Sequence, residues 1–101
     1  MAFEHLSCHT LKLWLDKSEN IELIDIRDPQ SYAAEHIPGA KHIGNHNVAS
    51  FLKDADPQRP LVVCCYHGNS SQGAADYFNQ QGIEQCYSLD GGFESWRQID
   101  N

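Results

Sequence analysis

The sequence predicts an α/β fold built on a mainly parallel β-sheet. Short apolar runs, some of them rich in β-branched residues, alternate along the 101 residues with segments that have the spacing of amphipathic helices. This alternation is typical of parallel strands joined by crossover helices. Neither an internal repeat nor a low-complexity segment interrupts the pattern. We therefore expect a single domain over residues 1–101.

Five segments are strand candidates. Residues 61–65 form a continuous apolar run after Pro60, which is typical of a central parallel strand buried on both faces. Residues 21–26 form a second buried strand. The other candidates are residues 86–89, residues 41–43 and an edge strand within residues 3–7.

Five segments are helix candidates. The clearest covers residues 71–81, where the apolar side chains share one face and Gly82 can terminate the helix. Residues 10–17 repeat apolar side chains at i, i+3 and i+4. Trp14 and Trp96 are expected in the core. Shorter helices are expected over residues 30–35, 48–53 and 92–98.

The chain is acidic, with a formal net charge of −7. This charge argues against binding to nucleic acid or to an anionic membrane surface. No stretch approaches the roughly 20 apolar residues that span a bilayer. Residues 1–10 have neither the basic nor the apolar region of a signal peptide. We therefore expect a cytoplasmic protein whose cysteines are free thiols; these are Cys8, Cys64, Cys65 and Cys86.

The segment Cys65-Tyr66-His67-Gly68-Asn69-Ser70-Ser71 joins the predicted central strand to the clearest helix. Carboxyl ends of parallel strands form the functional crevice of open α/β sheets, and Cys65 lies at such an end. Gly68 permits a turn that gathers backbone N–H groups, and Ser70 or Ser71 can cap the helix. A thiol before a helix N-terminus is favoured as the nucleophilic thiolate. Cys65 is therefore a candidate nucleophile, and a buried structural cysteine is the alternative.

Cations are scarce near this segment, because no Lys or Arg occurs between Arg59 and Arg97. Backbone dipoles would have to stabilise a bound anion, helped by His67 or by Arg27 or Lys41 from another strand end. This favours a small anion or a single sulfur over a phosphate ester. The simpler interpretations are that His67 is solvated and that Arg27 fixes the end of its strand.

The other cysteines are interpreted as core residues. Cys64 adjoins Cys65, but successive strand residues face opposite sides of a sheet, so Cys64 is expected to point into the core. Cys8 and Cys86 have no partner suggested by spacing. The histidines near Cys8 and Cys65 do not form a recognised zinc-ligand spacing, and no metal site is expected.

Three segments resemble the rhodanese family. Cys65–Ser71 is similar to the active-site loop of its single-domain members. Residues 25–40, with Asp-Ile-Arg-Asp-Pro and His-Ile-Pro-Gly-Ala, resemble the N-terminal signature, and residues 90–96 resemble the C-terminal one. The resemblance runs over nearly the whole chain. It implies a rhodanese-like α/β fold, with a central, mainly parallel five-stranded sheet flanked by helices on both faces.

The resemblance also implies a thiosulfate sulfurtransferase that works by double displacement through a persulfide on the catalytic Cys65. The rest of a six-residue substrate-binding loop would be Tyr66, His67, Gly68, Asn69 and Ser70. Ser71 would support the helix N-terminus. The sulfur acceptor would be cyanide in vitro and a cellular dithiol such as thioredoxin. No metal or organic cofactor is implied, and the chain would be a monomer or a weak homodimer.

Several positions depart from the family pattern. Many members carry Arg where Ser70 stands, and Gln72 stands where a basic residue is expected, so thiosulfate binding should be weaker. Glu35 replaces a common Gly, which we expect to be a minor structural change. A cysteine phosphatase or arsenate reductase would need a longer loop or an Arg that clamps the anion. A non-turnover persulfide carrier or redox sensor is the alternative function, because it shares the chemistry of Cys65.

Overall fold

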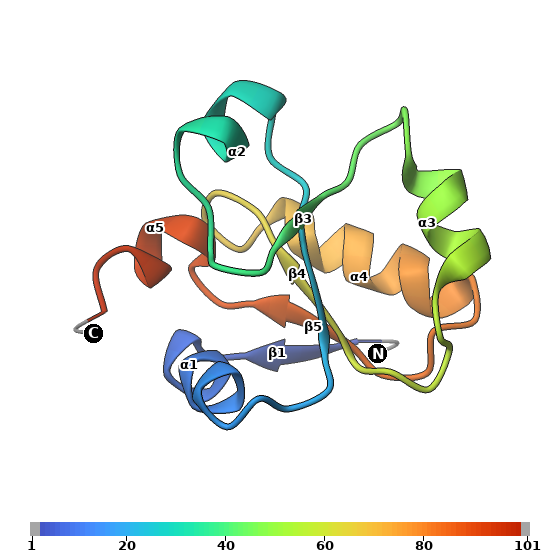
Figure 1. Cartoon of the computed structure of the whole chain (residues 1–101), viewed down its shortest axis with the longest axis horizontal. Coiled ribbons are helices and arrows are strands. Elements are labelled where there is room, and N and C mark those ends of the chain that lie inside the picture. The colour runs from blue at the N-terminus through green and yellow to red at the C-terminus, as the bar shows by residue number, and fades with distance from the viewer. Residues whose placement is uncertain (1–2, 100–101) are drawn as a thin grey trace.

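The computed structural model describes residues 3–99, in which five strands and five helices alternate along the chain (Figure 1). The strands are β1 (Glu4–Leu6), β2 (Glu22–Asp25), β3 (Lys41–His42), β4 (Leu61–Cys64) and β5 (Cys86–Leu89). The helices are α1 (Cys8–Asp16), α2 (Pro29–Ala34), α3 (Val48–Asp54), α4 (Ser70–Gln80) and α5 (Gly92–Trp96). Each element lies within about two residues of its predicted segment, which is the ordinary margin for element ends. Within residues 3–99, every helix falls short of the length and apolar character needed to cross a membrane.

All the strand pairs are parallel, and the strand order is β1-β5-β4-β2-β3. The central strand β4 pairs with β2 on one side and with β5 on the other. Its four residues are all buried, as the apolar run predicts. Because the strands run in the same direction, the carboxyl ends of β2, β4 and β5 meet at one edge of the sheet.

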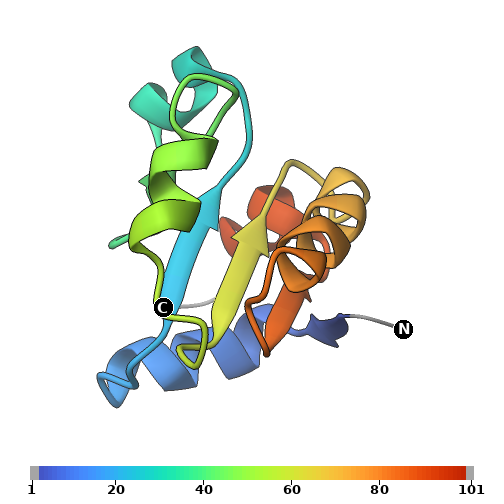
Figure 2. The same cartoon turned by 90° about the vertical axis from the view of Figure 1, so that its right-hand side faces the viewer.

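The helices cover both faces of the sheet (Figure 2), which confirms the predicted architecture. On one face, Val62 and Cys64 of β4 pack in a core cluster with residues of α1 and α5. On the other face, Leu61 and Val63 pack with residues of α4 and against α3. The expected inward direction of Cys64 is therefore confirmed. Trp14 and Trp96 are half-buried and pack against the first cluster.

The sheet places Cys65 immediately after β4, and α4 begins at Ser70. Residues 65–69 therefore make the whole connection between the central strand and the helix that covers it. A connection this short holds its backbone close to the edge where the strand ends meet.

Candidate active site

Hydrogen-bond donors converge on the sulfur of Cys65. The backbone N–H groups of Gly68 and Ser71 donate to its Sγ at 3.2 and 3.3 Å. The Ser71 Oγ lies 3.2 Å from the same sulfur. Cys65 is 4% exposed, so the sulfur is nearly enclosed by these groups. Donors fixed around one buried atom stabilise negative charge on it.

The sulfur takes the position of a helix cap, which corrects one expectation. Neither Ser70 nor Ser71 precedes α4, because both lie in its first turn, and Asn69 at the N-cap position makes no side-chain capping bond. A capping oxygen would accept from an N–H of that turn. Here the N–H of Ser71 donates to Cys65 instead. A sulfur that serves as the cap is held at the positive end of the helix dipole.

Two glycines let the loop pack closely against the start of α5. Gly68 has φ +88°, and a Cβ built on it would lie 2.8 Å from the backbone nitrogen of Gly91. A Cβ on Gly92 would lie 2.4 Å from the carbonyl oxygen of Cys65. That carbonyl accepts a hydrogen bond of 2.7 Å from the amide of Phe93. The carbonyl side of Cys65 is thus fixed by α5, while its sulfur is fixed by α4.

Among residues 3–99, the hydrogen bonds to the sulfur come from Gly68 and Ser71, and the side chains of the other predicted loop residues make none. Tyr66, His67, Asn69 and Ser70 are exposed. The rings of Tyr66 and His67 lie 6.4 Å apart. Of the predicted loop residues, Gly68 is the one whose amide lies within hydrogen-bond distance of Sγ in the described part of the chain.

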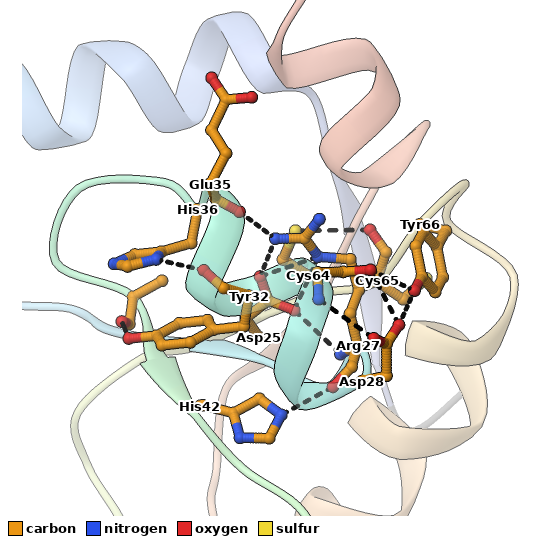
Figure 3. Close-up of polar contacts among 12 residues, drawn as sticks. Asp25, Arg27, Asp28, Tyr32, Glu35, His36, His42, Cys64, Cys65 and Tyr66 are labelled. Carbon is orange, nitrogen blue, oxygen red and sulfur yellow. Dashed lines mark hydrogen bonds and ion pairs between the residues drawn. The ribbon is translucent and has the colours of Figure 1, made fainter.

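Tyr66 connects the loop to α2 (Figure 3). Its hydroxyl donates to the carboxylate of Asp28 and lies 2.7 Å from the Ser31 Oγ. Asp28 also caps α2 by accepting from the amide of Ser31 at 3.0 Å. Hydrogen bonds from the backbone and side chain of Ser31 hold the pKa of Asp28 below its usual value. Hydrophobic periodicity could not reveal this contact, because it joins exposed residues that are distant in the sequence.

Arg27 is a structural residue, as its simpler interpretation proposed (Figure 3). Its Nη2 lies 2.8 Å from Asp25 Oδ2, and both side chains are almost fully buried. The same nitrogen donates to the carbonyl of Glu35 at 2.6 Å, and the guanidinium lies 4.1 Å from the ring centre of Phe93. Burial acts to lower the pKa of Arg27, but the hydrogen bond and charge of Asp25 raise it above its ordinary value.

Lys41 does not reach the loop, so that expectation was wrong. Its ammonium pairs with Glu22 at 3.3 Å, and Glu22 is the first residue of β2. The pair therefore lies toward the amino end of the strand, away from Cys65. Gln72, in place of a basic residue, donates from Nε2 to the carbonyl of Gly68 at 2.9 Å and thus closes the loop on itself.

The other three cysteines are free and buried, as predicted. Burial raises the pKa of Cys64, and the charge of Asp25 adds to the rise. Burial raises the pKa of Cys86 to about 11, and burial followed by the charge of Asp90 raises that of Cys8. These three thiols are therefore held in the neutral form.

Sequence reasoning missed Ser88. Its Oγ lies 2.7 Å from the Ser71 Oγ, and both serines are fully buried. A signal was present in the sequence, because Ser88 occupies a position within a predicted strand that faces the core. A hydroxyl there requires a buried partner.

The parallel sheet and the cysteine loop at its carboxyl edge define a class of protein. Residues 7–99 match the rhodanese-like domain family, and the chain belongs to that family. The predicted family and fold are thereby confirmed.

Curated relatives point to a particular member of the family. "Thiosulfate sulfurtransferase GlpE" of Pseudomonas aeruginosa is 59% identical over 83 residues, which cover 82% of this chain and 76% of the relative. The protein of the same name from Pseudoalteromonas translucida is 52% identical over 97 residues, which cover 95% of this chain and 90% of the relative. Among solved structures, the rhodanese-like domain of an Anabaena sp. protein is 24% identical with a TM-score of 0.86, and the match covers 96% of this chain and 75% of that one.

Proposed function

We propose that this protein is a thiosulfate sulfurtransferase in which Cys65 carries the transferred sulfur as a persulfide. The similarity to the GlpE relatives over most of both chains supports the activity and its substrate. The observation that supports Cys65 as the carrier is the convergence of the Gly68 and Ser71 amides on its sulfur. None of the other three cysteines has such a pair of donors in the described residues.

The reaction has two displacements. The Cys65 thiolate first attacks the outer sulfur of thiosulfate, so that a new S–S bond forms while sulfite leaves with the electron pair of the bond that breaks. A thiophilic acceptor then attacks the terminal sulfur of the persulfide, and the electron pair returns to Sγ. The two amides lie where this charge is regenerated, and such fixed dipoles favour the transition state in which it appears.

The substrate-binding role is assigned to the loop residues Tyr66, His67, Gly68, Asn69 and Ser70. Four of them, Tyr66, His67, Asn69 and Ser70, are exposed beside a nearly buried sulfur, and Gly68 directs its amide at that sulfur, which supports a site for a small anion. Arg27 is paired to Asp25 and Lys41 to Glu22, so no Lys or Arg described in residues 3–99 makes a hydrogen bond or ion pair with the loop. The Arg27 guanidinium meets the loop only at the ring of Tyr66, 5.7 Å from its centre. The lack of a free cation at the sulfur among these residues supports weak thiosulfate affinity.

The proposal also covers the sulfur acceptor, the cellular location and the oligomeric state. Cyanide would serve as the acceptor in vitro, and a dithiol such as thioredoxin would serve in the cell. The cytoplasm keeps such dithiols reduced, and it is the proposed location. The single domain would act as a monomer or a weak homodimer.

Intact-mass measurement after incubation with thiosulfate tests the proposal. We expect a gain of about 32 Da that maps to Cys65 and is removed by cyanide, because the thiolate is the reactive form. Cys65→Ser should show no gain and no thiocyanate production while remaining folded. An absent adduct on a Cys65 that still reacts with iodoacetamide would overturn thiosulfate as the donor. An adduct without turnover would identify a persulfide carrier.

A further inference from the structure

Three buried side chains from three neighbouring elements form a line that ends on the candidate nucleophile. Cys65 follows β4, Ser71 lies in the first turn of α4, and Ser88 lies on β5. The Ser71 Oγ is 3.2 Å from the Cys65 Sγ and 2.7 Å from the Ser88 Oγ. Both serines have 0% relative exposure, so their hydroxyl protons must find acceptors within the protein.

The number of hydroxyl protons decides which group donates in each of these hydrogen bonds. Each hydroxyl has one proton, and a buried donor without an acceptor is unfavourable. Within residues 3–99, the hydrogen-bond partner of the Ser88 hydroxyl is the Ser71 Oγ. If Ser88 donates to Ser71, the proton of Ser71 is free to point at sulfur. The opposite direction belongs to the neutral thiol, whose sulfur donates to the Ser71 Oγ, and it leaves the proton of Ser88 without an acceptor among residues 3–99. A thiolate has no proton to donate, so ionisation of Cys65 requires the first direction.

We infer that Ser71 is a further catalytic residue, whose hydroxyl donates to the Cys65 sulfur whenever that sulfur bears charge. Ser88 is a positioning residue that fixes the direction of the Ser71 hydroxyl. The inference rests on the proposed role of Cys65 as sulfur carrier. It adds a third donor to the two amides, and it assigns a function to a strand serine that no loop motif contains.

The two displacements should depend on this hydroxyl differently. In the persulfide, the charge is mainly on the outer sulfur. During discharge to the acceptor, the bond from Sγ to the outer sulfur breaks, the electron pair returns to Sγ, and the bond from Ser71 strengthens. The proton stays on Ser71 throughout. During loading, stabilising the thiolate raises its amount but lowers its nucleophilicity, so the two effects partly cancel.

Ser88→Ala is the main test, and Val63→Ala is its matched control. Val63 pairs in register with Ser88 and belongs to the core cluster on the α4 face, so its truncation loosens the same region without removing a hydroxyl. Ser71→Ala/Ser88→Ala removes the whole line and leaves no unpaired hydroxyl behind. Thermal melting establishes that each variant is folded.

Cyanide first removes any persulfide from each protein, and two measurements are then made. The first is the pH profile of alkylation at Cys65, followed by mass spectrometry of its peptide. The second is the single-turnover rate of discharge to cyanide after loading. We expect Ser88→Ala to shift the pH profile of Cys65 alkylation to higher pH by about half to one unit. The same variant should discharge its sulfur to cyanide about three- to tenfold more slowly. Loading at a pH where the thiol is ionised should change less. The double variant should show at least the same effects, and Val63→Ala should show neither.

The inference is overturned if Ser88→Ala and the double variant keep the wild-type profile within about 0.2 pH unit. It is equally overturned if Val63→Ala shifts the profile as far as Ser88→Ala does, because the effect would then reflect loosened packing. Cys65→Ser separates this inference from the proposed function. If Cys65→Ser still transfers sulfur, the proposed function itself is wrong. If Cys65→Ser loses transfer while Ser88→Ala keeps the wild-type pH profile of alkylation, only the role of the two serines is wrong.

Discussion

The amide of Ser71 donates to the sulfur of Cys65 at 3.3 Å, so the first turn of α4 is capped by a thiol. Side-chain oxygens usually fill this position. The substitution of sulfur for oxygen joins helix stability to the chemistry of the site, because the same group that satisfies the helix N-terminus is the candidate nucleophile.

Gly68→Ala should impair both the site and the fold. The residue has φ +88°, and its new Cβ would meet backbone atoms of Gly91 and Leu89, which cannot rotate away. We expect a loss of at least about 2 kcal/mol in the free energy of unfolding and a large fall in sulfur transfer, since the Gly68 amide would move away from Sγ.

Gly73→Ala is the matched control for Gly68→Ala. Gly73 lies inside α4, and a Cβ there would meet nothing within 4 Å. Alanine should therefore stabilise the helix by about 0.5–1 kcal/mol and leave transfer unchanged. Urea unfolding and thiocyanate production measure both variants. Wild-type stability in Gly68→Ala would contradict the close packing between the loop and α5.

Asp25→Asn should destabilise the protein strongly. It removes the charge that pairs with Arg27, and the guanidinium would remain buried with a neutral partner. Breaking one side of a buried ion pair typically reduces the free energy of unfolding by about 3–5 kcal/mol. Equilibrium denaturation in urea measures the loss.

Lys12→Met is the control for Asp25→Asn. Lys12 pairs with Asp16 at 3.3 Å, four residues further along α1 and on its exposed side. Exposed pairs of this kind contribute about 0.5 kcal/mol or less, so stability should hardly change. Equal losses in the two variants would show that burial of the Asp25–Arg27 pair has no energetic consequence.

Stability should fall at alkaline pH because buried thiols resist ionisation. The folded state holds the proton of Cys86 up to a pKa of about 11, above the usual value for cysteine. A raised pKa of this kind gives stability that is fully present below the unfolded pKa and is lost as the pH rises toward the folded one. The loss should therefore occur between about pH 8.5 and pH 11. Melting temperatures measured across this range should fall less steeply in Cys86→Ala. An identical slope in that variant would contradict the assignment to Cys86.

Much of the fold could be predicted from the sequence, because its strongest signals are local. The apolar run at residues 61–65 located the central strand, and alternation along it predicted that Cys64 faces the core. Cys65 was expected as the last residue of that strand, and the structure places it directly after β4. The turn after Cys65 was also predictable, since Gly68 indicates a backbone that other residues rarely adopt.

The rest of the site depends on contacts that periodicity does not specify. Alternation predicts which face Ser88 occupies but not that Ser71 lies opposite it. The capping expectation for Ser70 or Ser71 was wrong because a nearby sulfur competed for the same amide. Lys41 was one of three side chains that could have reached the anion, and its pairing with Glu22 was not predictable because the two residues are distant in the sequence.

The bond from the Phe93 amide to the Cys65 carbonyl has a consequence for the order in which the protein matures. A chain emerges from the ribosome from its N-terminus, so Cys65 appears well before Ser88, Gly92 and Phe93. A nascent chain exposes this thiol without the strand and helix that fix its backbone. The nucleophile is therefore assembled only after Phe93 has been made, and a chain that stops before this residue holds an ordinary cysteine at position 65.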